Sequence, residues 1–158
     1  MGQHSELHAF MGHENPSIVG DVAASGGTHA TGSVSDPRAV AAFARERHVF
    51  GRPLAKHQVT RHKLADLATS VYTCRCVTYD ALRRFMAGEE PMREVTMAKL
   101  LTQRSSFELM DDCLQIHGGA GYMREYWVER AARDARLGPI GGGSDVIMRE
   151  ILGRSYGL

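Results

Sequence analysis

An apolar stripe that repeats at steps of three and four residues dominates the middle of the chain. It runs for about six helical turns and consists of Leu64, Leu67, Val71, Cys74, Thr78, Ala81 and Phe85. This spacing puts every member on one face of an α-helix, so the segment predicts a long helix that buries one side against a partner. Gly88 is expected to end the helix, because glycine readily takes the left-handed conformation of a helix terminus.

Start and stop signals elsewhere predict four more helices, at residues 37–50, 91–117, 125–137 and 145–154. Asp36 and Pro37 suit the first helix start, because proline lacks the N–H that goes unpaired there. One face of the second carries Ala98, Leu101, Ser105, Leu109, Asp112 and Ile116. No strand-like alternation exceeds four residues. The sequence therefore predicts an all-α fold, an up-and-down helical bundle with two long antiparallel helices.

Residues 1–35 differ in composition from the rest of the chain. Between Gly20 and Ser35 lie four glycines and three serines without a sustained apolar period. Such a segment buries too little apolar surface to offset its ordering entropy, so we expect a flexible leader at 1–35 and a helical domain at 36–158. Its histidines lack a scaffold that would fix metal-ligand geometry, and no metal site is expected; they are His4, His8, His13 and His29.

The composition excludes several function classes. With 19 Lys and Arg against 18 Asp and Glu, the net charge is +1, and no basic segment is present to attract nucleic acid. No apolar run approaches the eighteen residues that a membrane span needs, and the amino terminus lacks the features of a signal peptide. Three cysteines, an odd number, fit a reducing compartment better than a disulfide framework. We therefore expect a cytoplasmic location.

Three segments contain residues suited to binding a ligand. In the first, residues 47–58, a helix end is followed by a turn that the guanidinium groups of Arg47 and Arg52 flank. Guanidinium groups suit an anionic partner such as a pyrophosphate. The alternative is that these charges only complement the negative end of the helix dipole, and the residues by themselves favour that alternative.

The other two segments are rich in glycine. Residues 115–122 include three glycines in four positions, which opens the backbone to a ligand, although an elaborate helix cap would use the same residues. Residues 140–145 hold three successive glycines before Ser144, which can cap the last helix. The N–H groups of that terminus suit an anion, although the lysine of a P-loop is absent and a flexible connection also fits.

The three segments stand in order with other short motifs between them. The motif positions are Arg47, Phe50, Gly51, Leu54, Gln58, 63–66, Ala98, Lys99, 115–122, Glu125, Tyr126, 133–136, Pro139 and Ile140 with the glycine-rich turn that follows. Over about residues 38–156, roughly three quarters of the chain, they resemble the C-terminal domain of the flavin-dependent acyl-CoA dehydrogenases. The resemblance implies an oxidoreductase of fatty acid metabolism with FAD as cofactor and an acyl-CoA as substrate.

The resemblance also implies roles for individual positions. Family residues that contact FAD, mostly the flavin of a neighbouring subunit, match Arg47, Phe50, His57 and Gln58. The stretch that lies against the FAD pyrophosphate and adenosine matches Gln115, Ile116, His117, Gly118 and Gly119. A further cofactor contact matches Ser144. Contacts across subunits imply a homo-oligomer, dimer or tetramer, and they favour the pyrophosphate interpretation of Arg47.

One departure from the family concerns the catalytic base. Many members carry a glutamate at the position of Gly142, where it removes the α-proton of the acyl-CoA while hydride passes to the flavin. Glycine cannot do this. In the long-chain and isovaleryl branches the base comes from the domain's first helix, and an ungapped register places it at Asp21, without the arginine that usually accompanies it. The turn sequence looks closest to the long-chain branch.

A second departure is length. Family members are more than twice as long, and the N-terminal helical domain and middle β-domain are not recognisable here. We therefore expect a truncated product, one part of a split enzyme or an excised domain. Two functions stay open: a piece of an acyl-CoA dehydrogenase that is inactive without a chain carrying the missing domains, or a non-catalytic helical oligomerisation module. The near-zero net charge disfavours a DNA-binding domain.

Overall fold

The computed structural model describes residues 37–158. The predicted leader, the proposed base Asp21 and the expected helix cap Asp36 lie outside these residues.

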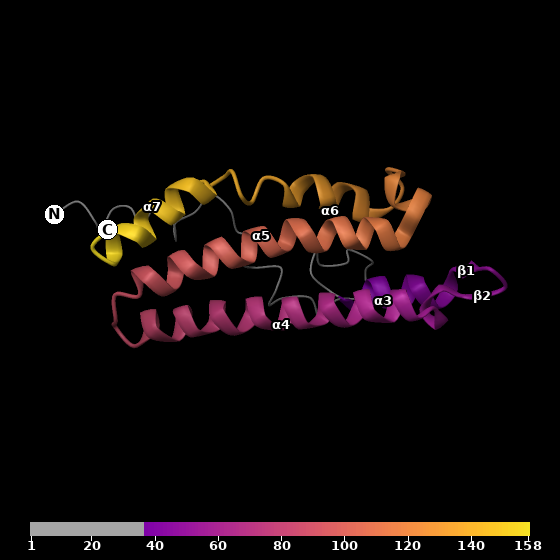
Figure 1. The fold of residues 1–158 in the computed structure, drawn as a ribbon, viewed down its shortest axis with the longest axis horizontal. Helices are drawn as coiled ribbons and strands as arrows, with labels where there is room; N and C mark the ends of the chain where they lie inside the picture. Colours follow the sequence, from indigo (N-terminus) through magenta and orange to yellow (C-terminus); the bar gives the residue numbers. More distant parts are fainter. Residues whose placement is uncertain (1–36) are drawn as a thin grey trace.

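The described residues form the all-α bundle that the sequence predicts (Figure 1). In chain order the elements are α3 (Pro37–Glu46), β1 (His48–Val49), β2 (Arg52–Pro53), the 3-10 turn η1 (Leu54–Lys56), α4 (Gln58–Met86), α5 (Met92–His117), the 3-10 turn η2 (Gly118–Tyr122), α6 (Trp127–Ala135) and α7 (Asp145–Ser155). The long helices α4 and α5 lie antiparallel and side by side. On the other side of α5 lie α6 and then α7, and α3 packs where α4 begins and α5 ends.

The core lies where α3, α4, α5 and α6 meet. It contains Val40, Leu67, Met110, Cys113, Ile116, Val128, Ala131 and Ala135. The predicted stripe of α4 faces this core at Leu67, with Leu64 and Val71 half-buried at its margin, and Ala81 is buried further along the helix. Phe85, at the far end of the stripe, is 41% exposed. The periodicity of α4 therefore predicted its inner face correctly except at that end.

The predicted inner face of α5 is wrong at Leu101, which is 37% exposed. The reason is that α5 has neighbours on two sides, α4 on one and α6 and α7 on the other. Its buried positions therefore spread around the helix and are Thr96, Ala98, Lys99, Met110, Cys113, Ile116 and His117. A single stripe describes a helix with one buried side, and α5 is not such a helix.

The end of the first helix and the cap of the last differ from the prediction. The first helix ends at Glu46 and not near Phe50, because the chain reverses there in a short antiparallel hairpin of β1 and β2. Ser144 does occupy the N-cap position of α7, as predicted, but among residues 37–158 its hydroxyl makes no capping hydrogen bond. Ser144 therefore stands at the N-cap position of α7 without making the hydrogen bond of a side-chain cap.

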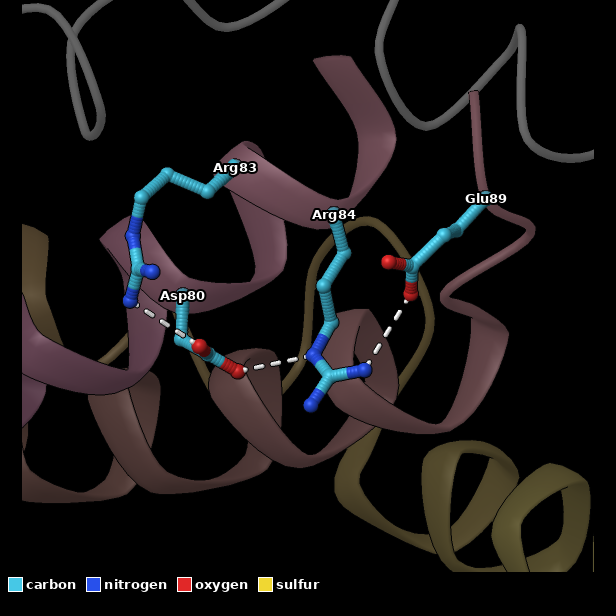
Figure 2. A network of polar contacts seen from close by, with 4 residues as sticks. All are labelled: Asp80, Arg83, Arg84 and Glu89. Atoms are coloured by element: carbon cyan, nitrogen blue, oxygen red, sulfur yellow. Dashed lines mark hydrogen bonds and ion pairs between the residues drawn. The ribbon is translucent and has the colours of Figure 1, made fainter. Parts of the chain in front are cut away.

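The turn between α4 and α5 carries a network of exposed charges (Figure 2). Arg84 donates to Asp80 (Nε–Oδ2 3.0 Å) and to Glu89 (Nη1–Oε2 3.1 Å), and Arg83 donates to the second oxygen of Asp80. Exposed pairs of this kind add little stability. The turn depends more on Gly88, whose φ of 81° ends the helix as the sequence predicts.

Within residues 37–158, no helix combines the length and apolar character that crossing a bilayer requires.

Candidate functional site

The first predicted segment folds into a β-hairpin whose tip stands away from the bundle (Figure 1). Val49 pairs with Arg52, and the two residues between them both have positive φ, 50° at Phe50 and 76° at Gly51. Two successive positive φ angles define a type I′ turn, which matches the twist of a hairpin. Glycine takes this conformation freely, but for phenylalanine it is uncommon and strained. Phe50 is also 96% exposed, so packing of its side chain in the described fold does little to offset the strain.

His57 holds this hairpin through hydrogen bonds to two of its residues. Its Nε2–H donates to the carbonyl of Val49 at 3.2 Å, and Arg52 donates from Nη2 to its Nδ1 at 3.3 Å. An arginine has no acceptor, so Nδ1 must accept and the proton must sit on Nε2. The Phe50 ring lies edge-on to the imidazole with centroids 6.4 Å apart. The tip is therefore held in one orientation although it is exposed.

The other two predicted residues of this segment lie at its ends. Arg47 follows α3 directly, is exposed, and accepts at its carbonyl from the N–H of Leu54 at 2.7 Å. Gln58 opens α4, is exposed, and its side-chain amide lies 3.5 Å from Nε2 of His62. Both side chains therefore stay accessible beside the hairpin.

The second predicted segment divides into buried and exposed parts. Ile116 and His117 are buried, while Gln115, Gly118 and Gly119 are exposed. Among the described residues, no atom lies within 4 Å of the point where a Cβ would stand on Gly118 or Gly119. The open backbone at these glycines is thus not required by packing, and a ligand can approach it.

His117 is part of the core. Its side chain is 5% exposed, and its Nδ1–H donates to the carbonyl of Cys113 at 2.7 Å. Burial lowers the pKa of His117, and the hydrogen bond to the Cys113 carbonyl opposes this only in part. The imidazole is therefore neutral near pH 7, and a ligand at this turn meets Gln115 and the glycine backbone before it meets His117.

A stack between Phe43 and His117 joins the first two segments. The ring centroids are 4.0 Å apart and the planes differ by 21°. Phe43 lies in the last turns of α3, which leads into the hairpin, and His117 is the last residue of α5. The hairpin and the Gly118 turn therefore occupy the same end of the bundle (Figure 1).

The third predicted segment is organised around Lys99 of α5. The Lys99 side chain is 7% exposed, and its ammonium group donates to the carbonyl of Gly141 at 2.9 Å and to that of Gly143. Desolvation lowers the pKa of Lys99, and the charge of Asp145 opposes that shift. Gly142 is exposed at the turn's apex with a φ of 60°. Ser144 is half-buried between the turn and α7.

This third segment does not meet the other two within one chain. Lys99 and His117 stand on the same helix, and at 1.5 Å per residue the two turns that they adjoin lie about 27 Å apart along its axis. Arg47, the Gly118 turn and the Ser144 turn therefore cannot converge on one diphosphate within a single chain. A cofactor that touches both ends must reach along the domain or lie between subunits.

The described residues offer little other chemistry. Burial raises the pKa of the Cys113 thiol to about 12, with the charge of Asp112 adding to the shift, so this cysteine is not a nucleophile at neutral pH. Cys74, predicted as a core residue, is half-buried, and Cys76 is exposed. Within residues 37–158 no three His, Cys, Asp or Glu side chains gather as a metal site requires.

Comparison with known proteins decides the family. The family described as acyl-CoA dehydrogenase, C-terminal domain, matches residues 36–157. The chain belongs to the acyl-CoA dehydrogenases. Its helical bundle is the C-terminal domain of that family, in agreement with the motifs of the sequence.

Individual relatives agree with this assignment. A 3-(aryl)acrylate reductase from Clostridium sporogenes is 34% identical over 110 residues, which make up 70% of this chain and 29% of that protein. The mitochondrial long-chain specific acyl-CoA dehydrogenase of Sus scrofa is 36% identical over 112 residues, 71% of this chain and 26% of that one. The structure of butyryl-CoA dehydrogenase from Megasphaera elsdenii matches with a TM-score of 0.74 at 27% identity, covering 77% of this chain and 32% of that chain. The chain thus spans under a third of the length of these relatives.

Two side chains of this acyl-CoA dehydrogenase domain support the predicted segments without having been singled out for a role. Phe43 precedes Arg47 by four residues, which is one helical turn, and this spacing was the signal in the sequence that could have linked Phe43 to the first segment. Lys99 follows Ala98 on α5, and both are buried. A charged residue on the apolar side of a helix was the signal that could have indicated its role.

Proposed function

We propose that this chain is the FAD-contacting C-terminal part of an acyl-CoA dehydrogenase that oxidises the α,β bond of an acyl-CoA thioester. It works in a homo-oligomer, dimer or tetramer, or with a chain that carries the remaining domains. The observation that carries the proposal is that the strained and exposed Phe50 and the open backbone of Gly118 and Gly119 lie at the same end of the bundle. Strain that side-chain packing does little to offset is characteristic of a binding element.

The residues at this end fit the chemical groups of FAD. A guanidinium such as that of Arg47 suits the diphosphate, and an exposed aromatic ring such as that of Phe50 suits a flat heterocycle. Gln58 and Gln115 offer amide groups that both donate and accept. Gly118 and Gly119 leave room for a close backbone approach, with Ile116 and His117 as the packed support beneath. His57 holds the hairpin and so acts through Phe50, and Ser144 is proposed to contact FAD from the other end of α5.

Bound FAD supplies the hydride acceptor of the reaction. The chain's own contribution to the proton transfer is limited, because Gly142 has no side chain at the position where many relatives carry a glutamate. We assign the base to Asp21, as in the long-chain branch, and expect negligible dehydrogenase activity from the isolated chain. We place the protein in the cytoplasm.

A second function, a non-catalytic oligomerisation module, is favoured by one observation. Several large apolar side chains of α4 and α7 are exposed: Val59 65%, Tyr72 70%, Met86 76%, Val146 72% and Ile147 51%. Large exposed apolar side chains are available for contact with a second copy of the chain. A chain with this function would still form an oligomer but would not bind FAD.

The absorption spectrum of the purified chain with added FAD, measured as it elutes by size with its mass, separates the two functions. We expect a visible flavin band that co-elutes with an oligomer. Arg47→Ala should abolish the band, while Arg75→Ala, an exposed arginine in the middle of α4, should leave it unchanged. A colourless oligomer would contradict the flavin function and favour the module.

A further inference from the structure

The glycine-rich turn at residues 139–145 is held from outside by a side chain of another helix. Inside the turn, the N–H of Gly141 donates to the carbonyl of Leu137 at 2.7 Å, and the N–H of Asp145 donates to the carbonyl of Pro139 at 3.1 Å. These two bonds close the ends of the turn and leave the carbonyls of Gly141 and Gly143 to find other donors. Lys99 of α5 supplies that donor to both.

The setting of Lys99 is unusual for a lysine. Lysines are almost never fully buried unless paired, because removing an ammonium group from water is costly. Here the side chain is 7% exposed and its hydrogen bonds go to two neutral backbone carbonyls. A methionine of similar length would fill the same space without that cost, so the ammonium group itself has a use at this position.

A second set of charges ties the turn to the same helix. Asp145, the first residue of α7, has a side chain that is 14% exposed and lies 3.9 Å from Arg104 of α5 and 3.7 Å from Arg149 of α7. α5 therefore contacts the turn at two places: Lys99 binds the carbonyls of Gly141 and Gly143, and Arg104 lies beside Asp145 at its end. Gly142 lies between the two residues whose carbonyls Lys99 holds, and the point where its Cβ would stand is 3.8 Å from Cε of Lys99.

We propose that Lys99 is the positioning residue of the glycine-rich turn: by fixing the carbonyls of Gly141 and Gly143 it presents Gly142 and Ser144 in one orientation to cofactor and substrate. The inference rests on the proposed function, because that function gives the turn something to contact. Lys99 acts on the turn and not on the reacting atoms. Its loss should therefore loosen the turn locally and weaken FAD binding without unfolding the bundle.

The test compares Lys99→Met with Lys63→Met. Lys63 is the matched control, because it also joins two helices, through its ion pair with Asp112, but lies away from the turn. Amide hydrogen exchange is measured by NMR at Gly141 and Asp145 and at the interior residues of α5. We expect Lys99→Met to speed exchange at Gly141 and Asp145 at least tenfold and to leave α5 unchanged, while Lys63→Met leaves the turn unchanged.

FAD titration of the same variants tests the link to function. Lys99→Met should weaken FAD binding at least tenfold, and Lys63→Met should change it less than twofold. The positioning role is overturned if the Lys99→Met turn exchanges as slowly as wild type, or if it speeds up only together with the whole of α5. It is overturned too if the turn loosens while FAD affinity stays at the wild-type value. If the wild-type chain binds no FAD, the proposed function fails, and the exchange rates alone decide whether Lys99 holds the turn.

Discussion

The ring of Phe43 stacks against the imidazole of His117 with 4.0 Å between the ring centroids, and this contact helps to join the two segments proposed to bind FAD. Trp127 of α6 adds an edge-to-face contact to the same imidazole at 6.0 Å. His117 is thus packed by α3 on one face and by α6 at its edge. The hairpin and the Gly118 turn are thus linked through the packing of α3 on the end of α5, to which half-buried Phe43 and buried His117 contribute this stack.

Phe43→Ala should destabilise the domain by about 2–4 kcal/mol, because it removes a large packed ring and leaves a cavity beside His117. Urea unfolding followed by circular dichroism measures this change. Phe85→Ala is the matched control, since that ring is 41% exposed at the far end of α4 and should cost less than about 1 kcal/mol. Equal losses in the two variants would show that the stack does not carry the packing attributed to it.

The stability of the domain should fall as the pH drops below about 6.5. Burial lowers the pKa of His117 in the folded state, so the unfolded chain takes up a proton at a pH where the folded chain does not. The contribution of neutral His117 to stability is complete above its pKa in the unfolded chain and is lost as the pH falls toward its pKa in the folded chain. Unfolding free energies between about pH 7.5 and 5 measure the slope. His117→Gln should flatten it and the exposed control His62→Gln should not; an NMR titration that places the pKa of His117 above its ordinary value would contradict the prediction.

Alanine should be destabilising at one glycine of this turn, Gly121, and tolerated at another, Gly119. A Cβ on Gly121 would stand 2.7 Å from the carbonyl oxygen of Leu114 and 3.0 Å from Cβ of His117, so Gly121→Ala should cost about 1–3 kcal/mol. Among the described residues nothing lies within 4 Å of the same point on Gly119, and Gly119→Ala should change stability by less than about 0.5 kcal/mol.

The FAD affinity of the Gly119→Ala chain tests whether this open backbone contacts the cofactor. Gly119→Ala should weaken FAD binding, because the added methyl group occupies the space in which FAD is proposed to contact the backbone of Gly119. A Gly119→Ala chain that binds FAD as well as wild type would mean that this backbone is open for another reason.

The helices were predictable from the sequence because their signals are local. The stripe of α4 and its end at Gly88 depend on residues within one helix and one turn. The inner face of α5 was not predictable in the same way, since α5 packs against α4 on one side and against α6 and α7 on another, and Leu101 is 37% exposed. Which side of a helix is buried depends on where later segments pack, and no periodicity within the helix encodes that.

The candidate site shows the same division. Its residue types could be read from the motifs, but the hairpin could not, because phenylalanine is not a residue that favours positive φ. Lys99 and Gly141 are 42 positions apart, so their contact is a property of the fold and not of either motif. The separation of the Ser144 turn from the Gly118 turn likewise follows from the length of α5.

Replacing Phe50 should stabilise the domain while removing its proposed function. Phe50→Asn creates an Asn-Gly pair, which favours a type I′ turn, and should raise the unfolding free energy by about 0.5–1 kcal/mol. Phe50→Ala is the control, because it removes the 96% exposed ring without relieving the backbone and should leave stability near the wild-type value. Both variants should lose FAD affinity, as measured by the flavin absorption band. If Phe50→Asn is no more stable than Phe50→Ala, the backbone at Phe50 is not strained; if both bind FAD like wild type, the ring contributes nothing to the cofactor.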